Sequence, residues 1–136
     1  MSDTSIPAPG REALPHTDDT TQADATAQLV DQATRDIGDV PAAEIITTTA
    51  VHLMSAAAVK CGLADHGEDE MDLAEARALI DALAGLITAS AQHIGNHHAL
   101  SLRDGLRAVQ LAFREASPVP DEPGSGPGEK YTSPVS

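Results

Sequence analysis

Apolar side chains recur at helical spacing in three stretches of the chain, and the clearest stretch is residues 71–95. Asp72 stands three residues before Glu75, a spacing typical of a capped helix start, and Gly95 closes the pattern with a residue that tolerates positive φ. The sequence therefore predicts a helix here with one buried face. That face consists of Ala76, Ile80, Leu83, Ile87 and Ile94.

Two further helices are predicted on either side of this one. The first begins near Pro41, carries an apolar stripe from Ile46 to Cys61, and ends at Gly62, which has the character of a glycine C-cap. The last begins at Ser101, where Asp104 repeats the capping-box spacing, and ends before Ser117 and Pro118. We expect an all-α fold, with residues 39–116 forming an antiparallel three-helix unit.

Both ends of the chain lack this apolar period. Residues 1–38 are predicted to form a mostly disordered tail, although the spacing of Val30, Ala33 and Ile37 allows a short helix over residues 26–37. Residues 117–136 are rich in Pro, Gly and Ser and are predicted to be a disordered C-terminal tail.

Small residues form a second face of the central predicted helix, where another backbone could approach closely. This face is either a solvent-exposed alanine face or the site of a helix crossing, within the chain or between two copies. Gly85 supports the crossing, because glycine in a helix interior costs about 1 kcal/mol relative to alanine. The predicted seam is Ala78, Ala82, Gly85 and Ala89.

Composition limits the classes of partner. The formal net charge of -13 disfavours direct binding to nucleic acid, because phosphate backbones repel an acidic protein. The single Cys61 cannot form an intramolecular disulfide and is expected in the core of a cytoplasmic protein. The uncharged run from Ile45 to Val59 is judged too short to span a bilayer, so no membrane contact is expected.

Candidate chemistry is sparse. His93, His97 and His98 lie close together around Gly95 and are the candidate metal ligands, with three histidines that hold no metal as the favoured alternative. The acidic turn at residues 64–70 lacks the ligand positions of an EF-hand loop. No nucleophile elbow, phosphate-binding glycine loop or zincin helix occurs, so no catalytic residue, cofactor or enzymatic activity is expected.

The C-terminal tail contains the only Tyr, within GPGEKYT. A Tyr beside charged residues is a typical anchor for a short segment that orders on a partner, and a flexible tail without a ligand is the alternative. The candidate interaction residues are Gly126, Pro127, Gly128, Glu129, Lys130 and Tyr131. Since large apolar side chains are few for three helices, self-association or a docked partner is a further hypothesis.

Several runs of the chain resemble a bacterial family of uncharacterised proteins, domain of unknown function 1844. The likeness covers residues 39–135 and is carried by LMSAAA, by DLAEAR and IDALAGL, by LRDGL and by GPGEKYT. It implies a small, mostly helical cytoplasmic protein with no established activity. Relatives are often encoded near genes for translation initiation factor three and ribosomal proteins, so the resemblance implies a connection with translation.

These observations lead to one main hypothesis and two rivals. The main hypothesis is a non-enzymatic, self-associating helical adaptor whose GPGEKYT segment contacts a protein partner. The rival from another class is a metal-binding or small-molecule-binding protein built on His93, His97 and His98. The third is a structural subunit that uses its helices and not its tail.

Overall fold

The computed structural model describes residues 21–32, 34, 37–65 and 67–135. The chain divides into two units, Met1–Val40 and Pro41–Ser136. In the first unit, the described residues 21–32, 34, 37 and 38 are helical. The described residues of the predicted range 26–37 are thus helical, and helical structure begins earlier than predicted, at residue 21. The prediction of disorder for residues 1–20 lies outside the described residues. Ala33, assigned to the short predicted helix, also lies outside them.

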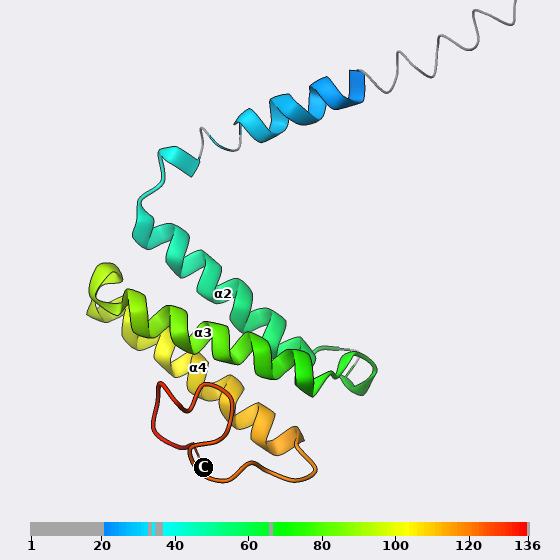
Figure 1. The fold of residues 1–136 in the computed structure, drawn as a ribbon, viewed down its shortest axis with the longest axis vertical. Helices are drawn as coiled ribbons and strands as arrows, with labels where there is room; N and C mark the ends of the chain where they lie inside the picture. Colours follow the sequence, from blue (N-terminus) through cyan, green and yellow to red (C-terminus); the bar gives the residue numbers. More distant parts are fainter. Residues whose placement is uncertain (1–20, 33, 35–36, 66, 136) are drawn as a thin grey trace, which may run out of the picture. The chain divides into compact units, whose positions relative to one another are not determined.

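The second unit contains the three predicted helices, which confirms the all-α fold class (Figure 1). They are α2 (Ala42–Lys60), α3 (Leu73–Ile94) and α4 (Asn96–Ala116), and the short 3-10 helix η2 (Gly67–Glu70) lies between α2 and α3. Consecutive helices run in opposite directions, and α3 contacts both α2 and α4. This is the antiparallel three-helix unit predicted from the sequence.

Local chemistry accounts for the ends of α2 and α3. The N–H of Gly62 donates to Val59 O and the N–H of Leu63 donates to Ala58 O, which is the Schellman pattern expected of a glycine C-cap. Gly62 has a φ of +90°, a conformation that glycine adopts without strain. The carboxylate of Asp72 accepts from the N–H of Glu75, so the predicted cap of α3 is confirmed.

The predicted start of the last helix is wrong. α4 begins at Asn96 and not at Ser101, so Gly95 alone separates α3 from α4. Gly95 reverses the chain with a φ of +89°, and the polar residues after it enter the helix directly. The capping-box spacing at Ser101 therefore lies inside a helical turn whose backbone groups are already bonded.

The core follows the predicted apolar stripes. Ile80, Leu83 and Ile87 of α3 are the largest fully buried side chains, and all five residues predicted for the buried face of this helix are buried. Cys61 is also buried, and burial raises the pKa of its thiol, as expected for an inert core residue. Gly105 of α4 leaves room for the side chain of Met54, which lets α2 and α4 approach closely.

Helix α2 differs from the other two helices in its exposure. Of the described helices, α2 alone has the length and the apolar composition needed to cross a membrane. Only 11% of the residues in its most apolar 18-residue stretch are buried. The length judged from the sequence was that of Ile45–Val59 alone, and the helix extends beyond this run at both ends. The expectation of no membrane contact stays a prediction. A core helix of a soluble protein can be equally long and apolar, but such a helix is mostly buried.

Candidate functional site

The C-terminal segment folds back onto α3 and α4 (Figure 1). Asp81 on α3 accepts a hydrogen bond from the N–H of Gly128 at 2.7 Å. Gln110 on α4 donates from Nε2 to Pro127 O at 3.0 Å and to Thr132 Oγ1 at 3.2 Å. We call residues 121–135 the docked tail. The prediction of a disordered C-terminal tail is wrong for this segment. It contains turns and no helix, and it makes specific contacts with α3 and α4.

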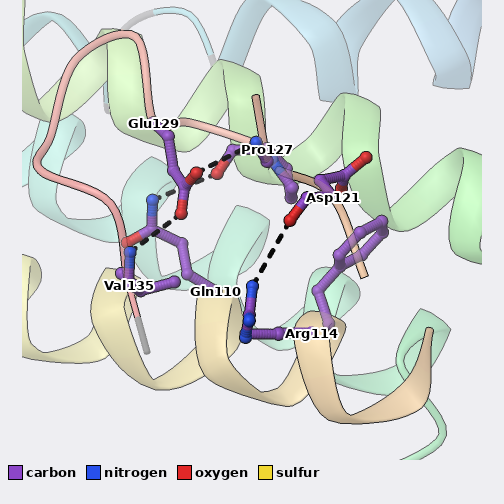
Figure 2. Close-up of a pocket in the computed structure, with 8 residues that line it drawn as sticks. Gln110, Arg114, Asp121, Pro127, Glu129 and Val135 are labelled. Carbon is purple, nitrogen blue, oxygen red and sulfur yellow. Dashed lines mark hydrogen bonds between the residues drawn. The ribbon is translucent and has the colours of Figure 1, made fainter. Parts of the chain in front are cut away.

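Glu129 organises the docked tail from within (Figure 2). Its side chain is 7% exposed, and its Oε1 accepts from the N–H groups of Gly124 and Gly126 at 2.9 and 3.0 Å. Its Oε2 accepts from the N–H of Val135 at 2.9 Å. A single carboxylate thus closes the segment into a loop by satisfying three backbone donors.

These contacts also fix the protonation of Glu129. Burial by itself raises the pKa of this carboxyl group, because it disfavours the charged form. The three backbone N–H groups and the positive charge of Arg114 act in the opposite direction and together hold the pKa below its ordinary value. Glu129 is therefore ionised at neutral pH and accepts all three bonds.

An arginine pair attaches the start of the docked tail. Arg77 on α3 forms a salt bridge with Asp121 at 2.8 Å, and its guanidinium lies 5.0 Å from the centre of the Phe113 ring. Arg114 on α4 donates to the backbone oxygen of Asp121 at 3.5 Å (Figure 2). Because both partners of the salt bridge are partly exposed, this ion pair contributes less than the buried contacts of Glu129 and Gln110.

Two glycines make the close approach of the tail to α3 possible. Gly128 has a φ of +75°, and a Cβ there would lie 3.0 Å from Ala84 Cβ and 3.0 Å from Gln110 Nε2. Gly85 on α3 faces the ring of Tyr131, whose nearest atoms would be 3.4 Å from an added Cβ. The tail therefore fits this face closely, and Gly128 has little room for any side chain.

The predicted helix-packing seam is not covered by another helix of the described chain. Ala78, Ala82 and Ala89 are exposed, and Gly85 contacts the aromatic ring of the docked tail instead. Gly85 thus has a close neighbour, as predicted, but this neighbour is Tyr131 of the docked tail and not another helix. A crossing between two copies at this seam stays a prediction.

The six predicted interaction residues divide into two groups. Pro127, Gly128 and Glu129 are buried against the chain's own helices and Gly126 is half-buried, so these four are used within the molecule. Lys130 is exposed and Tyr131 is 43% exposed, with the Lys130 ammonium 5.0 Å from the ring centre. The part of GPGEKYT that faces solvent is therefore its last third.

The candidate metal ligands do not converge. His93, His97 and His98 are all exposed, and the rings of His97 and His98 lie 5.7 Å apart, edge to face. Within residues 21–32, 34, 37–65 and 67–135, no group of three or more His, Cys, Asp or Glu could hold a metal ion. The three histidines lie instead on exposed helical turns, His93 at the end of α3 and His97 and His98 at the start of α4.

The cavities are small or open. The space between the docked tail and α4 is about 10 Å³, roughly one water molecule, which leaves no room for a substrate. An open groove of about 370 Å³ lies where α2 begins, lined by Pro41, Ala43, Glu44, Thr47, Thr48 and His98. A second, of about 210 Å³, lies between α4 and the end of the docked tail beside Arg103 and Arg107.

The outer side of α2 carries apolar side chains that the three-helix unit leaves exposed. Ile45 and Val51 are 39% and 48% exposed. The hydroxyls of Thr47 and Thr49 donate to the carbonyls four residues earlier, at 2.7 and 2.8 Å. These two hydroxyls are satisfied within the helix and need no hydrogen-bond partner from outside.

The residues that hold the docked tail were missed in the sequence. Asp81 and Gln110 look like ordinary polar residues of amphipathic helices, and nothing in their spacing connects them to Pro127 or Gly128. One signal was available at Gln110, which directly follows Val109 of the apolar stripe and is 2% exposed. A polar residue on a buried face needs a partner, and here the tail supplies it.

Comparison with known proteins gives one result. The sequence model of the family described as "Domain of unknown function (DUF1844)" matches residues 42–115, more than half of the chain. No curated protein matches the chain. No solved structure matches it either.

Proposed function

Because the chain belongs to the DUF1844 family, which is defined by a domain of unknown function, we propose its role from its surfaces: it is a non-enzymatic protein-interaction module. In this proposal, α3, α4 and the docked tail form a stable support. Helix α2 presents its outer side to a protein partner.

The observation that carries this proposal is the exposure of the most apolar helix. Apolar residues lie on all sides of α2, and helices with this distribution are normally buried all round. In α2 only Ala50 and Ala57 are fully buried, and Ile46, Leu53 and Met54 are partly buried against the core. Ile45 and Val51 are exposed. An apolar helix surface that stays in water favours association, because burying it releases free energy in proportion to its area.

The docked tail supports the same role indirectly. Since Pro127 and Gly128 bind Gln110 and Asp81 of the chain's own helices and Glu129 closes the tail on itself, the tail contributes to the support. Lys130 and Tyr131 are the exposed residues of this segment that can extend a contact. This changes the hypothesis drawn from the sequence, in which the whole GPGEKYT segment met the partner.

Affinity capture with matched baits tests the proposal. The Val51→Glu substitution places a charge on the exposed side of α2, and Val119→Glu makes the same change at a residue that is 84% exposed outside the helices. Both variants should keep the helicity of the native chain. A partner held by native and Val119→Glu baits and lost with Val51→Glu supports α2 as the contact.

Equal recovery with all three baits would contradict the α2 contact. A fourth bait, Gly128→Ala, loosens the docked tail and isolates its share of the interaction. Ribosomal or initiation-factor components among the α2-dependent proteins would extend the proposal to translation.

A further inference from the structure

One side of α4 carries a line of long polar side chains, three of them arginines. Its members are spaced four, three and four residues apart, which places them on the same side of a helix. They are Arg103, Arg107, Gln110 and Arg114. Figure 2 shows the C-terminal part of this line, where Gln110 and Arg114 meet the docked tail.

The docked tail supplies the partners of the C-terminal part. The positive charge of Arg114 stabilises the ionised carboxylate of Glu129. The backbone oxygen of Asp121 accepts a hydrogen bond from the same guanidinium at 3.5 Å. Under the tail, negative charge and carbonyl oxygen therefore match the arginine of α4.

The N-terminal part of the line has no such match. Arg103 and Arg107 are exposed, and neither takes part in a hydrogen bond or an ion pair in the part of the chain that the structure describes. Like charges four residues apart on a helix repel each other. Asp104 is next to Arg103 in the sequence, but it does not line the groove beside the two arginines. Their charges are therefore available to an anion from outside.

The groove beside Arg103 and Arg107 has one wall from α4 and one from the docked tail. It is open and has a volume of about 210 Å³. The wall from α4 includes both arginines and Leu106, and the wall from the tail consists of Thr132, Ser133 and Val135. Thr132 Oγ1 already accepts from Gln110 and donates to the backbone oxygen of Ser133. Ser133 is exposed and adds a hydroxyl to the groove.

A phosphate group suits these donors better than a carboxylate does. One carboxylate balances only one of the two guanidinium charges, whereas a phosphate monoester carries a charge of about -1.5 to -2 at neutral pH. Its three terminal oxygens can accept from both arginines and from a hydroxyl at the same time, and the planar guanidinium binds phosphate through paired hydrogen bonds.

The acidic character of the whole chain does not prevent this binding. Salt largely screens charges that lie more than about 10 Å apart, so a small anion in the groove interacts mainly with the two arginines that it touches. An acidic protein would cover a larger area and would meet the carboxylates of a chain whose net charge is -13. These arguments favour a small anion.

We propose that Arg103 and Arg107 of α4, together with Ser133 of the docked tail, bind the phosphate group of a small molecule. The bound group bridges α4 and the end of the tail, so its binding and the docking of the tail stabilise each other. The site lies apart from α2, and its test is independent of the proposed protein contact.

A nuclear magnetic resonance titration of the isotope-labelled full chain with inorganic phosphate tests the site, with sodium chloride keeping the ionic strength constant. Backbone signals of α4 around Arg103 and Arg107 and of the tail around Ser133 should shift together and saturate, with a dissociation constant of about 1 mM or lower. Because each arginine contributes charged hydrogen bonds, Arg103→Gln and Arg107→Gln should each weaken binding about tenfold or more.

Two further variants separate the site from a general effect of charge. Lys60→Gln removes the same charge from the end of α2 and should leave the dissociation constant within about twofold of the native value. Ser133→Ala removes one hydroxyl donor and should weaken binding about threefold.

Hydrogen exchange tests the bridge between α4 and the tail. The N–H of Val135 donates to Glu129 and exchanges when the tail opens. Phosphate at about ten times its dissociation constant should slow this exchange about tenfold, because it binds only the docked form. The same concentration should not slow it in Arg107→Gln.

Glycerol phosphate distinguishes two sources of the phosphate group. Binding at least as tight as that of inorganic phosphate assigns the site to phosphate esters, and weaker binding assigns it to the free ion. Three results would overturn the proposal: no saturable shifts up to about 10 mM phosphate, equal binding by the native chain and both arginine variants, or equal shifts on adding chloride alone. Unchanged exchange of Val135 in saturating phosphate would overturn the bridge.

Discussion

The docked tail and α2 both pack on α3, but they are held by different forces. The tail has turns in place of a helix, and its attachment depends on named polar atoms, including Asp81 and Gln110. Helix α2 is regular and apolar, and it packs through Ala50 and Ala57 and the partly buried Ile46, Leu53 and Met54. Its outer side stays exposed. Regular secondary structure and completeness of packing are therefore separate properties in this molecule.

This difference has a physical basis. Each polar contact of the tail is directional and close, so one alternative side chain at a key position removes it. The apolar contact of α2 is not directional, and its outer side can accept any surface of suitable shape and polarity. The position of the tail is thus determined by contacts within the chain, whereas the outer side of α2 is available to a partner.

The largest effect is expected from Gly128→Ala. The new Cβ would meet Ala84 and Gln110 at 3.0 Å, and an L residue is strained at a φ of +75°. Together these should weaken docking of the tail by about 2–4 kcal/mol. The chain has one Tyr and no Trp, so the fluorescence of Tyr131 reports docking directly.

Gly124→Ala is the matched control for this substitution. Gly124 has a similar φ of +88°, but nothing lies within 4 Å of an added Cβ. It should therefore show only the backbone strain, about 1 kcal/mol. If the two variants lose equal stability, close packing of Gly128 against α3 and α4 does not hold the tail.

A smaller effect, with a characteristic pH dependence, is expected from Glu129→Gln. The amide cannot accept from the N–H of Val135 while also accepting from those of Gly124 and Gly126. The loss of charged hydrogen bonds should weaken docking by about 1.5–3 kcal/mol at neutral pH.

The sign of the pH effect follows from the lowered pKa of Glu129. Its contribution is complete above the ordinary value of 4.5 and is lost as pH falls through the lower pKa of the folded chain. Acid titration of the Tyr131 signal should therefore show release of the tail in the native chain below 4.5. In Glu129→Gln this acid step should be absent, and a step of unchanged size would assign it to another group.

The smallest effect is expected from Gly85→Ala. Alanine favours the helix by about 1 kcal/mol over glycine, and its Cβ would lie at ordinary contact distance, 3.4 Å, from the Tyr131 ring. Thermal unfolding should show a gain of up to about 1 kcal/mol, with the Tyr131 signal unchanged. A loss of stability would mean that the ring cannot yield and that Gly85 is needed for docking.

The sequence predicts regular elements better than irregular ones because regular elements have local signals. The cap at Asp72, the C-cap at Gly62 and the apolar stripe of α3 all depend on residues within a few positions of each other. The start of α4 was misplaced because two signals competed. The capping-box spacing at Ser101 favoured a later start, and the turn at Gly95 prevailed.

The docked tail was not predictable from composition, since its order depends on contacts between distant residues. Gly128 bonds to Asp81, 47 residues earlier, and Pro127 bonds to Gln110, 17 residues earlier. A segment rich in Pro, Gly and Ser usually lacks the apolar area to offset its conformational entropy. Here glycine permits the close approach, and one ionised carboxylate closes the loop.

Amide hydrogen exchange of the full chain, measured alone and with a protein captured through α2, tests this account most directly. The account predicts that the N–H groups of Gly124, Gly126, Gly128 and Val135 are protected in both samples. The protection of α2 should increase when the captured protein is added, because the partner covers its outer side. Exchange of the tail at the rate of an unfolded peptide, or protection of α2 that is unchanged by the captured protein, would contradict it.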